Sequence, residues 1–161
     1  WYAECVQYMP KTIFLTKDVD FSTTLSALNW SYYFIKDHVK SLTTTRGSVA
    51  KNIGEVYEVI SLIEKFRGKV EGGVCGHEFE VLQPETEKRY FVFNKIAFAR
   101  NGVVPTIVNE IAKKIDCPFF SVDIFLSIDD APRLVELGDG QVSDRKKWAV
   151  DRFFDVFKHH A

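Results

Sequence analysis

The sequence has few cysteines, and their spacing forms no framework. Cys5, Cys75 and Cys117 stand far apart in a chain of 161 residues. An odd number of cysteines without C-x-x-C spacing argues against a disulfide scaffold and against a zinc ribbon. The four histidines also lack metal-binding spacing. We therefore expect free thiols in a reducing cytoplasm.

Long apolar runs and an excess of one charge are both missing. The longest strongly apolar stretch, residues 118–128, is interrupted by Asp123 and is too short to cross a bilayer. No segment has the pattern of a secretory signal. The chain has 21 basic and 22 acidic side chains, for a formal net charge of -1. This balance disfavours nucleic acid and anionic membranes as partners, so we expect a cytoplasmic protein that binds neither.

Repeats, low-complexity tracts and Pro/Gly-rich linkers are absent as well. A Walker P-loop, a G-x-G-x-x-G fingerprint and a serine-nucleophile elbow are not found. The hydrophobic content of 46% and aromatic content of 14% fit one compact domain with a substantial core. The chain opens with Trp1 instead of methionine, so we expect a further segment upstream.

The remaining pattern predicts an α+β fold of meandering strands with helices packed on them. Residues 52–66 form the most secure helix, because apolar residues recur at helical spacing and Gly68 follows as a C-cap. Residues 41–48 form a loop of small hydroxyl residues. Further helices are expected over 106–115 and at the C-terminus, with strands over 12–15, 32–36, 78–82, 89–93, 96–99, 119–126 and 134–137.

Two acidic residues within the last apolar strands need an explanation. If residues 121–137 form a hairpin whose tip is the solvated pair Asp129 and Asp130, then Asp123 faces Glu136 on one side of the sheet, with Cβ atoms roughly 5 Å apart. The flanking residues are apolar, so we expect neither carboxylate to reach water easily. Like charges so placed are stable if one group is protonated or if a divalent cation bridges both. Alternatively, one acid faces solvent and pairs with a lysine.

Other residues suit an anionic or flat ligand. Lys36 closes a predicted strand and could reach phosphate oxygens, with the loop 41–48 as a lid or as a simple solvated turn. The Gly72-Gly73 pair allows close approach of the backbone to a ligand, and Glu78 could accept hydrogen bonds from ribose hydroxyls. Arg89 either clamps an anion or pairs with a nearby glutamate.

In this order, these elements resemble the ATP-grasp superfamily, over essentially the whole chain. Lys36 matches the strand lysine of that superfamily, and the loop 41–48 matches its flap. Glu71 and Glu78 match the hinge pair of glutamates, seven residues apart. Asp123 and Glu136 match the acids that hold magnesium. The runs at residues 34–41, 71–73 and 136–143 look like a small clade found in bacteria and phages, whose members are inferred to be peptide or amide ligases.

The resemblance implies a single ATP-grasp domain over residues 1–161. It would consist of two small α+β lobes, about 1–70 with the flap and about 71–161 with the metal site, and ATP would lie between their antiparallel sheets. A preceding domain would be absent from this chain. The implied cofactors are ATP and Mg²⁺, and the implied partners are a carboxylate and an amine substrate, a peptide or protein among them.

Roles for individual residues follow from the same resemblance. Lys36 and Arg89 would be catalytic, and Asp123, Glu136 and Asp139 would hold the metal. ATP would contact Lys36 and the residues Lys40, Ser41, Glu71, Gly72, Gly73, Val74 and Glu78. One departure is Gly138, which stands where the family often has an asparagine ligand.

The function implied is a carbon–nitrogen ligase that forms an acyl-phosphate, without a protein nucleophile. One alternative is an ATP-binding protein with weak or no catalysis that serves in regulation or interaction. A protein acting on nucleic acid is a second alternative, and the near-neutral charge counts against it.

Overall fold

The computed structural model describes residues 1–16, 20–37, 47–68, 70 and 72–158. Its contacts divide the chain into two compact units. One unit is the continuous segment Pro10–Glu80, and the other combines Trp1–Met9 with Val81–Ala161.

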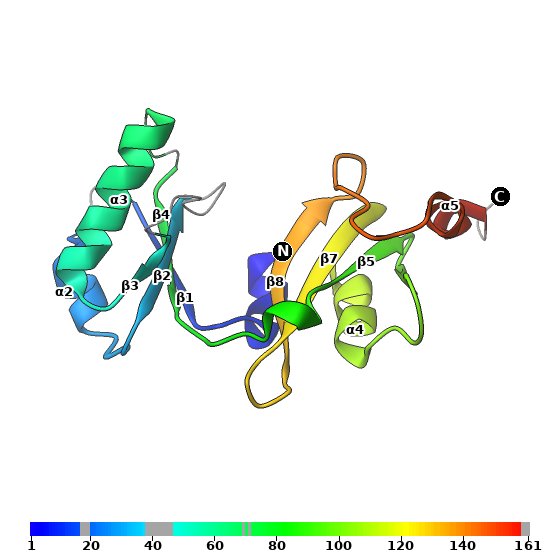
Figure 1. Cartoon of the computed structure of the whole chain (residues 1–161), viewed down its shortest axis with the longest axis horizontal. Helices are drawn as coiled ribbons and strands as arrows, with labels where there is room; N and C mark the ends of the chain where they lie inside the picture. Colours follow the sequence, from blue (N-terminus) through cyan, green and yellow to red (C-terminus); the bar gives the residue numbers. More distant parts are fainter. Residues whose placement is uncertain (17–19, 38–46, 69, 71, 159–161) are drawn as a thin grey trace. The chain divides into compact units, whose positions relative to one another are not determined.

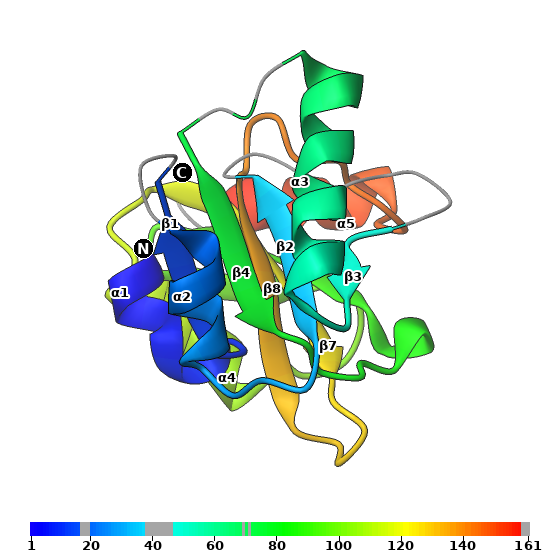
Figure 2. The same ribbon diagram turned by 90° about the vertical axis from the view of Figure 1, so that its left-hand side faces the viewer.

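The unit Pro10–Glu80 is a four-stranded antiparallel sheet with helices on one face (Figure 1). The strand order is β1-β4-β2-β3, so the last strand of the unit lies between the first two. Helices α2 and α3 cover the same face of this sheet in Figure 2. The elements are β1 (Thr12–Leu15), α2 (Phe21–Ser26), β2 (Tyr33–Asp37), β3 (Val49–Ala50), α3 (Ile53–Arg67) and β4 (Val74–Glu78).

Helix α3 shows how the local sequence fixes this unit. The Asn52 side chain accepts a hydrogen bond from the Glu55 backbone N–H, which caps the start of the helix. Gly68 ends the helix in the left-handed conformation with φ 80°, which glycine adopts without strain. Between these caps, Val56, Val59 and Ile63 are buried against the sheet. The helix expected over residues 52–66 is therefore confirmed.

The second unit is also a four-stranded antiparallel sheet, with the order β6-β5-β7-β8. One sheet face packs on α1 and α4, and the other carries an aromatic cluster built around Phe91, Trp148 and α5. The elements are α1 (Tyr2–Cys5), the 3-10 turns Val6–Tyr8 and Pro84–Thr86, β5 (Lys88–Phe93), β6 (Ile96–Ala99), α4 (Thr106–Lys114), β7 (Phe119–Leu126), β8 (Pro132–Asp139) and α5 (Val150–Lys158).

The alternation of side chains along β5 separates the two faces. Tyr90 and Val92 join the core beneath α4, and Phe91 points to the aromatic cluster. Asn94 and Lys95 both have positive φ, at 46° and 67°, and form the tight turn from β5 into β6. The turn expected at these two residues is confirmed.

The strand expected over residues 78–82 is wrong. The strand lies earlier, at Val74–Glu78, and Leu82 makes only an isolated bridge with Ser127. The alternation of apolar and polar residues continues past the end of the ladder, because Phe79 is the point where the chain leaves the sheet of one unit for the other. Helices α1 and α2 and the short strand β3 were also not expected.

None of the described helices has the length and apolar character that a bilayer span requires.

Gly73 tests the close approach of β4 to β1. Its φ of 133° is strained for other residues, and a Cβ there would lie 2.4 Å from the Leu15 carbonyl oxygen. We expect Gly73→Ala to lower the free energy of unfolding by roughly 3 kcal/mol, measured by urea denaturation.

Gly76→Ala is the matched control on the same strand. Its new Cβ would meet nothing nearer than Ile13 Cγ1 at 3.5 Å, so the change should stay within about 1 kcal/mol. Equal losses in the two variants would contradict the close approach at Gly73.

Candidate functional site

Three charged residues form a row across adjacent strands of the second unit. Arg89 on β5 is paired with Asp123 on β7, and Asp123 is paired with Glu136 on β8. Directly opposed residues of antiparallel strands point to the same side of a sheet. The three side chains therefore share the face that also carries Phe91. The sequence had placed Asp123 opposite Glu136, and the register agrees.

Asp123 is buried and its charge is balanced by Arg89. The Arg89 Nε donates to Asp123 Oδ1 over 2.8 Å, and Nη2 donates to Oδ2 over 2.6 Å. The two side chains are only 9% and 4% exposed. These hydrogen bonds raise the pKa of the Arg89 guanidinium. Arg89 thus pairs with Asp123, which resolves the choice that the sequence left open.

Lys146 is a second cation at Asp123, and the sequence analysis missed it. Its Nζ lies 3.1 Å from Asp123 Oδ2 and also pairs with Glu87. The residue follows β8 in an irregular segment and has a left-handed φ of 49°. No spacing rule links a loop lysine to an acid 23 positions earlier, so only the folded chain brings them together.

Glu136 differs from Asp123 in its surroundings. Its side chain is exposed, which corrects the expectation that apolar neighbours keep both carboxylates from water. The register shifts by one residue after Asp123, because Ile124 faces Leu134 and leaves Val135 as an extra residue. This bulge twists the strand locally. The single register expected for the whole hairpin is therefore wrong beyond the acid pair.

The region around Gly138 is closely packed on the same face. A Cβ at this position would lie 2.6 Å from Ser143 Oγ and 2.7 Å from Ser121 Oγ. The two hydroxyls are hydrogen-bonded to one another over 2.8 Å. They fill the space that a longer side chain at position 138 would need, so the glycine is required by packing.

Asp139 pairs with Phe120, one residue beyond Gly138. Strict alternation places it on the face opposite Asp123 and Glu136. Its Oδ1 accepts the Gln141 backbone N–H over 2.8 Å and so stabilises the turn after β8. Within the described part of the chain, no three His, Cys, Asp or Glu side chains gather as a metal-binding group.

The other unit places a lysine beside a buried cysteine and histidine. Lys36 is paired with Cys75 across β2 and β4, and His77 shares their face. Burial is the main cause that raises the pKa of the Cys75 thiol to about 11 and lowers the pKa of His77 to about 4. The positive charge of Lys36 adds to the lowering of the His77 pKa and offsets part of the rise at Cys75. Lys36 makes no ion pair with any residue that the structure describes.

The glycine segment before β4 has the conformation that close approach requires. Gly72 and Gly73 have φ of 74° and 133°, and Val74 begins the strand. Glu78 ends it, with a carboxylate 3.0 Å from Lys11 Nζ. Three other predicted ligand residues, Lys40, Ser41 and Glu71, lie outside the described residues, as does most of the predicted flap.

Removing Arg89 should expose the cost of burying Asp123. We expect Arg89→Met to lower the free energy of unfolding by roughly 3 kcal/mol, because the buried carboxylate keeps only Lys146. Lys158→Met breaks an exposed pair with Asp155 and should cost less than about 1 kcal/mol. Urea denaturation of both variants measures the difference, and an equally small loss in each would contradict the burial argument.

His77 should make stability depend on pH. Its pKa is lowered from 6.5 to about 4 in the folded protein, so the unfolded chain takes up a proton first as the pH falls. Stability is therefore full above pH 6.5 and decreases toward pH 4, by roughly 3 kcal/mol.

The measurement is the difference in unfolding free energy between the wild type and His77→Gln across this range. Other titrating groups cancel in that difference. A difference that does not change with pH would show that His77 is not held neutral.

Comparisons with known proteins bear on the whole arrangement. A sequence model of one family of ATP-grasp domains, the third family of its clade, matches residues 3–157. No curated protein matches the chain by sequence.

Several solved structures share the fold at low identity. Cdc123 from Schizosaccharomyces pombe is 14% identical with a TM-score of 0.62, covering 96% of this chain and 87% of its own. The ATP-grasp ligase PsnB is 12% identical with a TM-score of 0.58, covering 90% of this chain. D-alanine–D-alanine ligase from Bacillus anthracis is 13% identical with a TM-score of 0.57, covering 96% of this chain. The match spans 50% of PsnB and 58% of the D-alanine ligase.

The α+β architecture with two antiparallel sheets is thus the ATP-grasp fold, as the sequence predicted. With the match extending over nearly all of its length, the chain belongs to this clade family of ATP-grasp domains.

Proposed function

We propose that this chain is an ATP- and magnesium-dependent ligase that joins a carboxylate to an amine through an acyl-phosphate. The observation that carries the proposal is the row of Arg89, Asp123 and Glu136 across three strands of an ATP-grasp domain. PsnB, which shares the fold, was solved with a minimal precursor, Mg and ADP. The D-alanine ligase was solved with ATP.

Asp123 and Glu136 suit a magnesium ion. Magnesium is commonly held by one or two carboxylates, with phosphate oxygens and waters completing its shell. A carboxylate has about four acceptor positions. Arg89 uses one on each oxygen of Asp123, and Lys146 adds a contact to Oδ2, so Oδ1 retains an acceptor position. Glu136 is exposed and offers both of its oxygens. Bound magnesium would neutralise charge on the phosphates.

The other unit supplies a cation for phosphate. Lys36 has no carboxylate partner among the described residues, and it shares a sheet face with a neutral, buried His77. A strand lysine in this state is a point charge that suits phosphate oxygens. We assign the Gly72–Val74 backbone to adenine and Glu78 to the ribose. Lys40, Ser41 and Glu71 complete the proposed nucleotide contacts.

The reaction needs positioning and charge neutralisation more than a protein nucleophile. The substrate carboxylate attacks the γ-phosphorus of ATP and releases ADP, and the amine then displaces phosphate from the acyl carbon with loss of a proton. Arg89, anchored by Asp123, would orient a transferred phosphoryl or acyl oxygen. Asp139 is proposed as a further metal ligand, and its carboxylate would first have to leave the Gln141 N–H.

A second candidate is an ATP-binding protein with weak or no catalysis that serves in regulation or interaction. Two observations favour it. The Ser121 and Ser143 hydroxyls occupy the space where a side chain at position 138 could reach a metal. Asp123 is already paired with Arg89 and Lys146. Tight ATP binding without phosphate release would support this candidate over the ligase.

Glu136→Gln tests the metal role without removing a buried charge. We expect calorimetry to show magnesium-dependent ATP binding by the wild type and a loss of roughly 10- to 100-fold in magnesium affinity for the variant. Its free energy of unfolding should not change. Glu64→Gln, an exposed glutamate on α3, is the matched control and should bind as the wild type does.

Turnover is measured as phosphate release from ATP in the presence of mixed amino acids or peptides. We expect release that depends on both a carboxylate and an amine, and that falls in Glu136→Gln and Lys36→Met. No magnesium-dependent ATP binding by the wild type, or full activity in Glu136→Gln, would overturn the proposal.

A further inference from the structure

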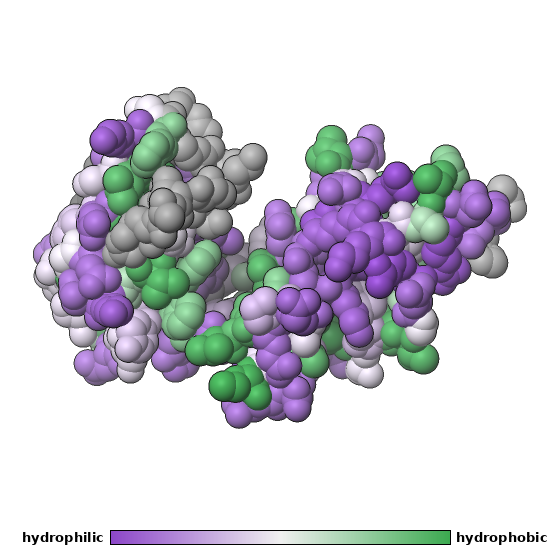
Figure 3. Space-filling view, viewed as in Figure 1, coloured by the Kyte–Doolittle hydropathy of each residue, from purple (hydrophilic) through white to green (hydrophobic). Residues whose placement is uncertain are grey.

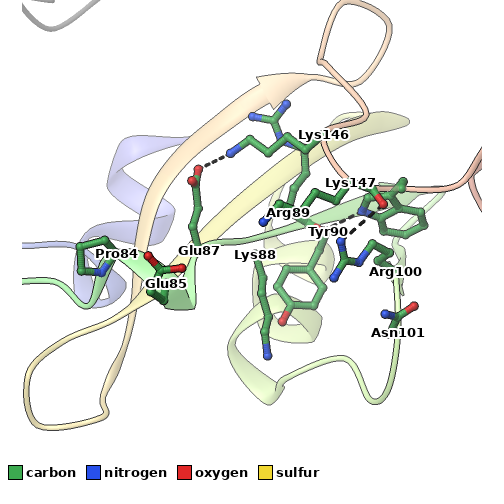
Figure 4. A pocket seen from close by; sticks show the side chains of 11 residues that line it. Pro84, Glu85, Glu87, Lys88, Arg89, Tyr90, Arg100, Asn101, Lys146 and Lys147 are labelled. Atoms are coloured by element: carbon green, nitrogen blue, oxygen red, sulfur yellow. Dashed lines mark hydrogen bonds and ion pairs between the residues drawn. The ribbon is translucent and has the colours of Figure 1, made fainter.

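A pocket of about 380 Å³ lies within the second unit, at the start of β5 (Figure 4). Strand β6 pairs with β5 only from Tyr90 to Phe93, so the preceding residues of β5 are not covered by it. The segment after β8 lies beside this stretch instead, and the Trp148 indole donates to the Arg89 carbonyl over 3.0 Å. The volume is at the low end of the range for ligand sites, which suits a group the size of one or two residues.

The pocket has an aromatic base and a charged rim. Tyr90 and Trp148 are 5% and 4% exposed, and burial raises the pKa of the tyrosine. In Figure 4 the side chains of Lys88 and Tyr90 leave β5 in the same direction, and Arg100 and Asn101 line the pocket from beyond β6. Figure 3 shows that hydrophilic residues dominate the surface around the start of β5.

The charges of the rim do not balance. Two of its cations are committed, because Arg89 binds Asp123 and Lys146 binds both Glu87 and Asp123. The other three cations are exposed and make no ion pair with any described residue, and they are Lys88, Arg100 and Lys147. Glu85 is the remaining carboxylate of the rim. Three uncommitted cations against one uncommitted carboxylate leave an excess of positive charge, which favours an anionic ligand.

The anion expected here is a carboxylate. Arg100 offers a planar fork that can pair with both oxygens of a carboxylate. The two glutamates of the rim would repel a polyphosphate more strongly than a singly charged group. The aromatic base suits a ligand whose charged end is attached to an apolar stem.

The pocket also shares side chains with the row of charges described above. Arg89 and Lys146 line the pocket and at the same time hold Asp123. A substrate that occupies the pocket is therefore one side chain away from the carboxylate to which we assign magnesium.

We propose that this basic pocket recognises a second, non-reacting carboxylate of the substrate, so that the ligase acts on an acidic compound carrying at least two carboxylates. The proposal rests on the proposed ligase function, which supplies the reacting carboxylate. Lys88, Arg100 and Lys147 are the residues that determine this specificity. The acidic substrate is either a peptide with neighbouring acidic residues or a small dicarboxylic acid.

The test compares tetra-glutamate, tetra-glutamine and free glutamate as probes, by calorimetry at low and high salt. We expect tetra-glutamate to bind and tetra-glutamine not to bind. The double variant Arg100→Gln, Lys147→Gln should weaken binding of the acidic probe by at least tenfold. The control Lys65→Gln, Lys113→Gln removes the same charge from exposed positions on α3 and α4 and should leave binding unchanged.

ATP binding by the same variants separates this proposal from the ligase function. The pocket double variant should bind Mg-ATP with the affinity of the wild type. Acidic-probe binding that is lost in this variant supports the pocket even if the wild type releases no phosphate. Free glutamate binding as tightly as tetra-glutamate identifies a small acid as the source of the carboxylate.

Two results would overturn the proposal. One is equal binding of the acidic and neutral peptides, or equal weakening by the pocket and control variants. The other is displacement of the probe by inorganic triphosphate together with weakened ATP binding in the pocket variant, since the pocket would then hold phosphate.

Discussion

The buried negative charge of Asp123 is the constraint on which the rest of the second unit depends. A carboxylate that is 4% exposed is stable only beside a partner with good hydrogen-bond geometry. Arg89 meets this need from the neighbouring strand, and its remaining nitrogen donates to the Asp144 carbonyl over 2.7 Å. Lys146 and Trp148 then tie the same segment to Asp123 and to β5. One charge thus fixes the course of the chain after β8.

The two units differ in the electrostatic demand they present. Around Asp123, three carboxylates including Glu87 and Glu136 face two cations, Arg89 and Lys146. This cluster has room for one more positive charge. On the face of β2 and β4, Lys36 stands alone beside groups that burial keeps neutral. That surface lacks a negative charge. A metal–phosphate ligand carries both signs and would satisfy each unit.

The sequence predicted much of the fold because its strongest signals are local. Helix α3 has caps at both ends, and the acid pair shares a hairpin whose register follows from its own alternation. What it missed depends on contacts between distant positions. Lys146 reaches Asp123 from a loop without periodicity, and the exposure of Glu136 depends on a bulge at Val135 that no residue type announces. The strand placed at 78–82 failed because polar alternation cannot show where a chain leaves a sheet.

The first nine residues have a consequence for how the molecule is made. Cys5 is fully buried in the core with α4, and Tyr8 hydrogen-bonds to Glu110, yet the whole of the other unit is inserted between them in sequence. A ribosome would therefore finish the continuous unit first, while the opening helix waits for partners about a hundred residues downstream. The contacts of the discontinuous unit span greater separations in sequence, so its assembly closes the larger loop. Excising residues 10–80 leaves one intact segment, whereas the remainder needs a new covalent bridge.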